Sequence, residues 1–178
     1  VLTSGFTAVT NSMLLELLEE TQRLISIDMI QMLRYPDFFE SGYKFKWDKD
    51  VSHYLDKVAD KDEAGKLRGL CHRIVRAMVE IYRLKSKEEL VEQIRKNTDL
   101  IRNSYSGEKN PPDIQRLKGM LREYEEELVW AHYGVPVRNI EHLRLGFYTG
   151  DIFTQQPDKH RDVEPILECL RRIQPNIV

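Results

Sequence analysis

The stretch LREYEEELVWAHYGV (residues 121–135) is followed by RNIEHLRLGFYTGDIF (138–153) and then by VEPILECLRRIQPNIV (163–178). The first and third stretches have the apolar spacing of helices, whereas the second contains a short apolar run of the kind that forms strands. Brief turns marked by glycine or proline join these elements. Helices that alternate with strands over short connections are typical of parallel α/β units. The sequence therefore predicts an α/β fold, dominated by helix, in which the chain is a fragment of a parallel sheet.

The beginning of the chain supports the same prediction. Residues 1–9 form an apolar, β-branched run that the triplet TSG (residues 3–5) interrupts. This is the composition of a strand that ends in a polar loop. We expect short parallel strands near residue 3 and at residues 141–145, and the opening of another strand at residues 176–178.

The middle of the chain has the periodicity of helices. The predicted helices span about residues 11–35, 49–58, 62–84 and 87–103, and a long helix ends at Gly134. We predict a single partial domain over residues 1–178, with a sheet strand and loop at 1–10, a helical insertion at 11–110 and helix–strand–helix units at 111–178. The aromatic residues of segment 38–47 are expected to be packed, because several rings left in water would forgo much of a small net stability.

The composition excludes several classes of protein. The chain has 178 residues and a net charge of -2, so it has no strong positive field to hold a nucleic-acid backbone. It contains no recognisable signal peptide and no apolar run long enough to cross a membrane, so no membrane partner is expected. Two cysteines, Cys71 and Cys169, are typical of buried thiols in a reducing compartment. A cytoplasmic location is therefore expected.

The sequence lacks the common catalytic and metal-binding motifs. It has no Gly-rich phosphate loop, no paired-cysteine zinc spacing, no nucleophile elbow and no HExxH. His72 is interpreted as a packed or solvated histidine, and His142 as a residue that either bonds the backbone or lies at the rim of a site. The run EYEEE (residues 123–127) is interpreted mainly as a solvated helix face, because consecutive helical positions cannot converge on one ion.

Several long runs carry a resemblance to a known family. They are TSGFTAVTN, LRGLCHRIVRAMVEIY, SYSGEKNPPDIQRLKGMLREYEEELVWAHYGV and HLRLGFYTGDIFTQQP. Together they resemble the C-terminal, deacetylase-like region of bacterial glucosamine-6-phosphate deaminase/isomerase-like fusion proteins. Arg122, Glu125 and the pair Gly134-Val135 are similar to elements of the N-acetylglucosaminyl de-N-acetylase superfamily. The resemblance implies a deacetylase-like sheet that carries a large helical insertion.

The resemblance also implies a function. The chain would be part of an amino-sugar metabolism enzyme, a hydrolase or isomerase, whose small-molecule partner is an amino sugar or a sugar phosphate. A substrate-binding role is implied for Thr3, Ser4, Arg122 and Glu125, with Arg122 toward an anionic sugar substituent. The family holds zinc with a His-Pro-Asp-Asp motif and a later histidine, neither of which occurs here. No catalytic residue, metal ligand or cofactor is therefore expected in the chain itself, whereas an intact member would carry zinc.

Two other hypotheses belong to different classes. The helical insertion could be a binding or assembly module on a degenerate, non-catalytic deacetylase-like domain, and self-association into a homo-oligomer is left open. A free-standing helical interaction domain is a third hypothesis, which the strand-like ends disfavour. For Arg122 and Glu125 the alternative interpretation is an ordinary ion pair three positions apart on a helix.

Overall fold

The computed structural model describes residues 5–35, 37–41, 49–105, 107–147 and 155–176. In chain order the elements, in which η denotes a short 3-10 helix, are η1 (Phe6–Ala8), α1 (Asn11–Ser26), η2 (Gln31–Arg34), α2 (Phe38–Ser41), α3 (Lys49–Ala59), α4 (Glu63–Tyr82), α5 (Lys87–Asn103), α6 (Pro112–His132), η4 (Val137–Asn139) and α7 (Lys159–Ile173).

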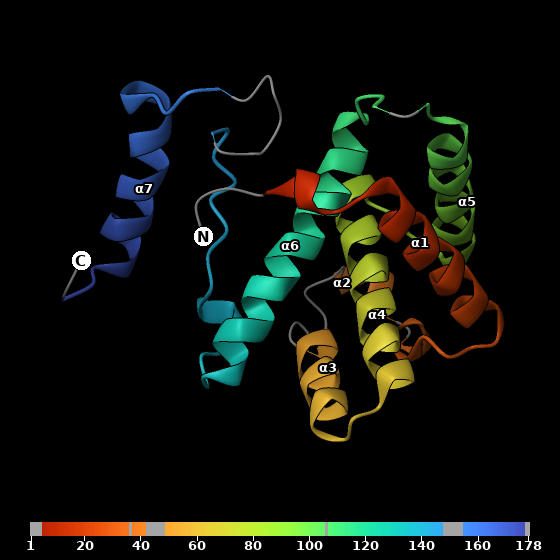
Figure 1. Ribbon diagram of the computed structural model, residues 1–178. Helices are drawn as coiled ribbons and strands as arrows, with labels where there is room; N and C mark the ends of the chain where they lie inside the picture. The colour runs from red at the N-terminus through yellow and green to blue at the C-terminus, as the bar shows by residue number, and fades with distance from the viewer. Residues whose placement is uncertain (1–4, 36, 42–48, 106, 148–154, 177–178) are drawn as a thin grey trace.

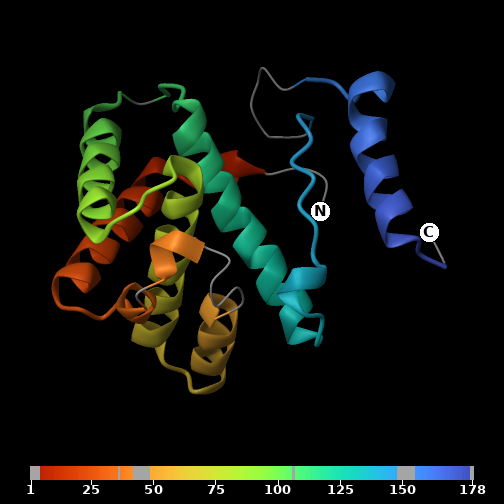
Figure 2. The same ribbon diagram turned by 180° about the vertical axis from the view of Figure 1, so that it is seen from behind.

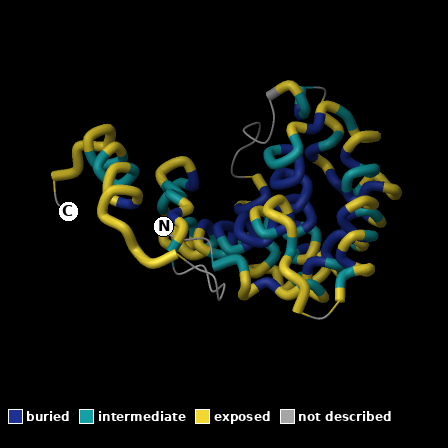
Figure 3. The backbone as a smooth tube through the Cα atoms, turned by 90° about the horizontal axis from the view of Figure 1, so that it is seen from above, coloured by how far each residue is buried: buried dark blue, intermediate teal, exposed yellow. Residues whose placement is uncertain are grey.

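Helices α1, α4, α5 and α6 form the body of the molecule, as Figures 1 and 2 show from opposite sides. α4 packs against α1, α3 and α6, and α1 also packs against α5. Apolar residues at helical spacing give each helix a stripe that faces this core. The fully buried core residues include Leu14, Leu18, Ile74, Met78, Leu90, Ile94, Ile114 and Leu117. The buried residues are accordingly concentrated in these helices, whereas most residues of α7 are exposed (Figure 3).

A smaller apolar cluster joins α3, α6 and η4. It contains Val51, Tyr124 and Val137, and Tyr54 packs its ring edge-on against Tyr124 with 5.8 Å between the ring centroids. Gly69 of α4 allows α4 to pack closely against α3. A Cβ atom at this position would lie 3.1 Å from the Cβ of Tyr54 on α3. Helix α3 is therefore held tightly against α4 at the base of the site described below.

The predicted parallel sheet is wrong. The described ranges contain no strand, and residues 141–145 form an extended segment in which Leu145 makes an isolated β-bridge. Arg144 has a left-handed backbone, with φ at 54°, and this interrupts the extended geometry that a strand requires. The strand predicted near residue 3 lies outside the described residues, as do residues 177 and 178. The helix-dominated character was predicted correctly, but the α/β class was not.

Capping side chains set the starts of several helices. The side chain of Asp62 accepts a hydrogen bond from the backbone N–H of Gly65 at 2.9 Å and starts α4. Ser86 does the same for α5, accepting from the N–H of Glu89 at 3.2 Å. Such caps satisfy backbone donors that a helix cannot pair internally. These starts agree with the sequence-based prediction.

Helix α1 ends earlier than its apolar pattern predicts. The expected end was near Tyr35, but α1 stops at Ser26 and the chain continues into η2. Asp28 adopts a left-handed backbone with φ at 54°, and the N–H of Met29 donates to the carbonyl of Leu24 at 2.8 Å. This is the hydrogen bond of a Schellman ending. Aspartate tolerates the left-handed conformation better than most residues, so it can replace the usual glycine.

The described part of the aromatic segment is packed, as expected. Phe38 is fully buried, and its ring meets that of Phe39 edge-to-face at a centroid distance of 5.1 Å. Phe39 also packs against the main core. Phe45 and Trp47 lie outside the described residues.

Helix α7 stands at the edge of the molecule, separated from α6 by the segment 137–147 (Figures 1 and 2). Its start is capped by Asp158, whose side chain accepts from the backbone N–H groups of His160 and Arg161. The helix predicted from VEPILECLRR is therefore present. Among the described helices, none has both the length and the apolar character needed to cross a membrane.

Candidate functional site

Four charged side chains are buried where α3, α4 and α6 meet. They are Asp50 of α3, Arg73 and Arg76 of α4, and Glu127 of α6, each at most 4% exposed. Arg73 donates to both carboxylate oxygens of Glu127, at 2.8 Å and 3.0 Å, and Arg76 donates to Asp50. A buried charge without a partner is strongly destabilising. The pairs therefore oblige these three helices to pack in one arrangement.

Tyr124 contacts two members of this buried group, Arg73 and the backbone of Asp50. The Arg73 guanidinium lies over its ring, with 5.3 Å from the guanidinium carbon to the ring centroid. The phenol donates a hydrogen bond to the backbone carbonyl of Asp50 at 3.0 Å. Arg73 also donates through Nε to the carbonyl of Met120 at 3.2 Å. Arg73 therefore contacts a carboxylate, a backbone carbonyl and an aromatic ring.

The segment that follows α6 adds a second row of pairs. His142 Nε2 lies 3.2 Å from Glu127 Oε1, and Arg144 donates two hydrogen bonds to Glu123, at 2.6 Å and 2.9 Å. Four residues along a helix advance by about 6.0 Å, and two extended residues advance by about 6.6 Å. This match lets two side chains of the returning segment meet two carboxylates one turn apart on α6.

Glu80 of α4 connects Arg144 to Arg116, a partly exposed arginine of α6. Its Oε1 accepts from Arg116 Nη2 at 3.0 Å and from Arg144 Nη1 at 3.4 Å. Two guanidinium groups therefore converge on one carboxylate oxygen. Both arginine side chains remain partly exposed, unlike the buried Arg73.

These contacts hold Glu127 and Arg144 in their charged forms. Burial by itself would raise the pKa of Glu127, but the hydrogen bond with His142 and the charges of Arg73 and Arg76 outweigh it and lower the pKa to about 2. The hydrogen bond to Glu123 raises the pKa of Arg144, and burial opposes this only in part. Glu127 and Arg144 are consequently charged at neutral pH.

Acid is expected to weaken the network between about pH 4.5 and pH 2. A carboxylate whose pKa is depressed in the folded state stabilises that state above its unfolded pKa and loses this contribution as pH falls toward the folded pKa. The free energy of unfolding, measured in urea at a series of pH values, should therefore differ most between the native chain and Glu127→Gln above pH 4.5. A difference that stayed constant down to about pH 2 would contradict the expectation.

The outer end of the network opens into a cleft of about 510 Å³. Its walls come from the first half of α6, from η1 and from residues 144–146. Arg116, Glu123 and Arg144 contribute charge, and Gln115 and Phe6 contribute an amide and an aromatic ring. The cleft can therefore offer guanidinium donors beside an apolar surface, which suits a small polar ligand with an anionic group.

The site residues predicted from the family resemblance lie elsewhere or outside the described ranges. Arg122 and Glu125 pair with each other on α6, with side chains 39% and 45% exposed, and neither lines the cleft. Thr3 and Ser4 lie outside the described residues, although Phe6, close to them in sequence, lines the cleft. The geometry of Arg122 and Glu125 is that of the alternative interpretation, an ion pair at positions i and i+3.

The burial of two carboxylates of α6 differs from the prediction. Glu123 and Glu127 were placed in a solvated run, but both are buried and paired with arginine. His142 pairs with Glu127 instead of the backbone bond that was one of its two interpretations. A signal was present: Arg73 and Arg76 interrupt the apolar run LCHRIVRAMV of α4, where a charged side chain requires a partner.

The described residues include no group of three or more His, Cys, Asp or Glu side chains placed to hold a metal ion. They therefore do not fit the zinc centre that the resembled family implies. The arrangement defines a helical chain with a buried charge network that opens into a cleft. Comparisons with protein-family models, with curated proteins and with solved structures found no match.

Proposed function

We propose that the chain is part of an amino-sugar metabolism enzyme and that the cleft between α6, η1 and residues 144–146 binds the amino sugar or sugar phosphate. The observation that carries the proposal is the convergence of Arg116 and Arg144 at the cleft, where both bond Glu80. The family resemblance of the sequence supplies the substrate class. Zinc would be expected in an intact member of the family.

The chemistry of the cleft agrees with this ligand class. Guanidinium groups present forked donors that match the oxygens of a phosphate. The ring of Phe6 offers an apolar surface for one face of a sugar ring. Gln115 donates its amide N–H to the carbonyl of Asn110 at 2.6 Å, which orients the amide oxygen. A volume of about 510 Å³ also falls within the range of roughly 300–1,000 Å³ that small-molecule sites occupy.

Arg116→Ala is expected to weaken the binding of glucosamine 6-phosphate or N-acetylglucosamine 6-phosphate by about tenfold or more. A hydrogen bond to a charged group contributes roughly 1.5–3 kcal/mol, and about 1.4 kcal/mol corresponds to one factor of ten. Binding would be measured by titration calorimetry with each sugar phosphate. Arg116 is a suitable target because its side chain is well exposed, so its removal should leave the core intact.

Arg122→Ala provides the matched control. Arg122 is on the same helix, is similarly exposed and also pairs with a glutamate, but it does not line the cleft. Its removal should leave the affinity unchanged. Equal losses in the two variants, or no binding by the native chain, would contradict the proposal. The second result would favour a helical binding or assembly module, for which Val129, Trp130 and Tyr133 of α6 and its C-terminus provide exposed apolar surface.

A further inference from the structure

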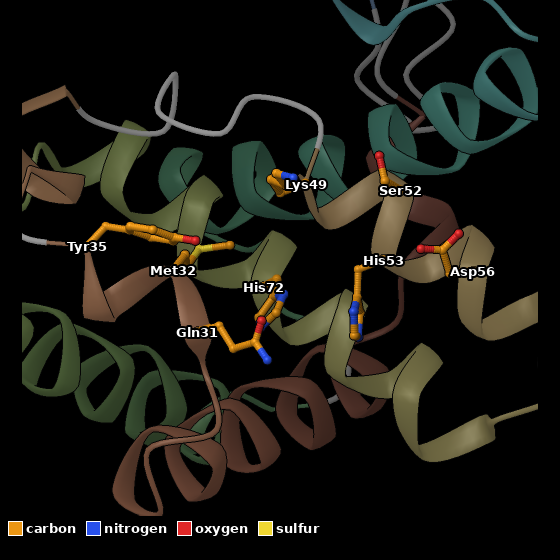
Figure 4. Close-up of a pocket in the computed structure, with 8 residues that line it drawn as sticks. All are labelled: Gln31, Met32, Tyr35, Lys49, Ser52, His53, Asp56 and His72. Atoms are coloured by element: carbon orange, nitrogen blue, oxygen red, sulfur yellow. The ribbon is translucent and has the colours of Figure 1, made fainter.

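A second cavity, of about 220 Å³, lies between η2, α3 and α4. Two histidines from different helices line it, His53 of α3 and His72 of α4, and their ring centroids are 5.4 Å apart. Figure 4 shows both rings among the lining side chains, with Asp56 on the same helix as His53. This cavity is separate from the cleft at Arg116 and shares no lining residue with it.

The two imidazoles share an unusual hydrogen-bonding state. The Nε2 atom of each ring is buried and has no hydrogen-bond partner. Buried polar atoms normally have a hydrogen-bond partner, so two unpartnered ring nitrogens beside one cavity point to a ligand. Neutral imidazole, through Nε2 or Nδ1, is the commonest metal ligand in proteins.

The surroundings of both rings also favour the neutral form. Burial, then the charges of His53 and Arg68, lower the pKa of His72 to about 4. Burial and the charge of Arg68 also lower the pKa of His53. A histidine must be deprotonated at the ligating nitrogen to bind a metal ion. Both shifts therefore favour the form of the ring that binds a metal ion.

We infer that this cavity binds a divalent transition-metal ion, of the zinc or copper type, through Nε2 of His53 and Nε2 of His72. Zinc–nitrogen bonds of about 2.0–2.1 Å in a tetrahedral arrangement place two imidazole centres roughly 5 Å apart, which agrees with the observed 5.4 Å. Imidazole nitrogen is a preferred ligand of these ions.

The remaining coordination positions fall to water or to a carboxylate. Asp56 lines the same cavity, but the described residues present no set of three protein ligands already in place. The site thus differs from a closed structural zinc site, and it also differs from the zinc centre of the resembled family, which uses a His-Pro-Asp-Asp motif. It resembles sites that keep open positions around the ion.

Arg68 opposes the binding of a cation and provides a sharp test. Its positive charge acts on both histidines. Lys57, the other cation that acts on His53, is already paired with Asp60 at 2.8 Å. Removing the charge of Arg68 should therefore tighten metal binding. A site for an anion would respond in the opposite direction, because the same substitution would remove an attractive charge.

The test is a titration of the folded 178-residue chain with zinc chloride at pH 7, followed by calorimetry. We expect one ion per chain, a loss of affinity of about tenfold or more in His53→Ala, and tighter binding in Arg68→Gln. Removing a residue that only orients a metal ligand typically lowers the affinity roughly 10- to 100-fold, so removing a ligand itself should cost at least as much. With Cu²⁺ in place of zinc, the electron paramagnetic resonance spectrum should show coupling to imidazole nitrogen that is reduced in His53→Ala.

His160→Ala is the matched control, because His160 is exposed at the start of α7, away from the cavity, and its loss should leave the affinity unchanged. Circular dichroism verifies the fold of each variant, and His53→Gln replaces His53→Ala if the alanine variant does not fold. Absence of zinc binding by the native chain, an affinity unchanged in the folded His53 variant, or weaker binding in Arg68→Gln would overturn the inference. These results are independent of sugar-phosphate binding at Arg116.

Discussion

Arg73→Met is expected to lower the free energy of unfolding by about 3–5 kcal/mol, the cost of leaving a buried charge without its partner. Arg73 donates two hydrogen bonds to Glu127 and lies 3.7 Å from Asp50. Methionine fills part of the volume but offers no donor, so the Glu127 carboxylate would keep only its contact with His142. Urea unfolding followed by circular dichroism measures the change. A loss below about 1 kcal/mol would show that the pair is no stronger than a surface ion pair.

Two further variants separate charge from packing. Arg95→Met removes an arginine that pairs with Glu92 on the exposed face of α5, and it should cost at most about 1 kcal/mol. The double variant Arg73→Met with Glu127→Leu should recover much of the lost stability, because a buried ion pair can often be replaced by apolar side chains at little cost. A double variant as unstable as Arg73→Met would instead assign the loss to the hydrogen bond with Met120 or to the shape of the site.

Phe38→Ala is expected to destabilise the fold by about 3–5 kcal/mol, the usual cost of removing a buried phenylalanine ring. Phe38 is fully buried in the short helix α2, where its ring meets Phe39 and packs into the main core. The cavity left by alanine could not close without moving α2. The shift in the urea midpoint at constant slope would measure the loss.

Tyr105→Ala is the control for this substitution. Tyr105 is also aromatic but is 72% exposed after the end of α5, so its removal should change the stability by less than about 0.5 kcal/mol. Similar losses in Phe38→Ala and Tyr105→Ala would contradict the assignment of Phe38 to the core. They would indicate a loosely packed core that tolerates the missing ring.

The helices could be predicted from the sequence because their signals are local. Apolar stripes of helical period predict helices that begin near residues 62 and 87, and the side chains of Asp62 and Ser86 cap the helices found there. The end of α1 could not be predicted in the same way. Its apolar pattern continues beyond Ser26, and the left-handed turn at Asp28 is favoured only by the aspartate itself.

The strand at 141–145 was predicted wrongly because its apolar pattern is shared by two environments. A run such as HLRL suits a sheet, but it also suits an extended segment that lies along a helix. The deciding contact is the pair of hydrogen bonds between Arg144 and Glu123, which are 21 residues apart. No periodicity within either segment reports a contact of this kind, and the left-handed Arg144 then excludes a continuous strand.

The candidate site depended on the same kind of long-range information. Arg122 and Glu125 could be located on one helix face from their spacing, and their ion pair was among the interpretations considered. Arg116 and Arg144 meet only because Glu80 of another helix accepts from both. His53 and His72 likewise lie close together only because α3 packs against α4. Gly69 permits this packing, but a single glycine in a helix does not predict it.

The buried charge network also restricts how this sequence can change over evolutionary time. Arg73 of α4 and Glu127 of α6 are 54 residues apart in the sequence and bond each other between the two helices. The carboxylate of Glu127 also contacts His142. A substitution at one of these positions leaves the others unmatched, so it passes through a poorly folded intermediate. Relatives of this chain should therefore keep these residues together or replace them together with apolar ones, and drift at the exposed positions of α5 should proceed one residue at a time.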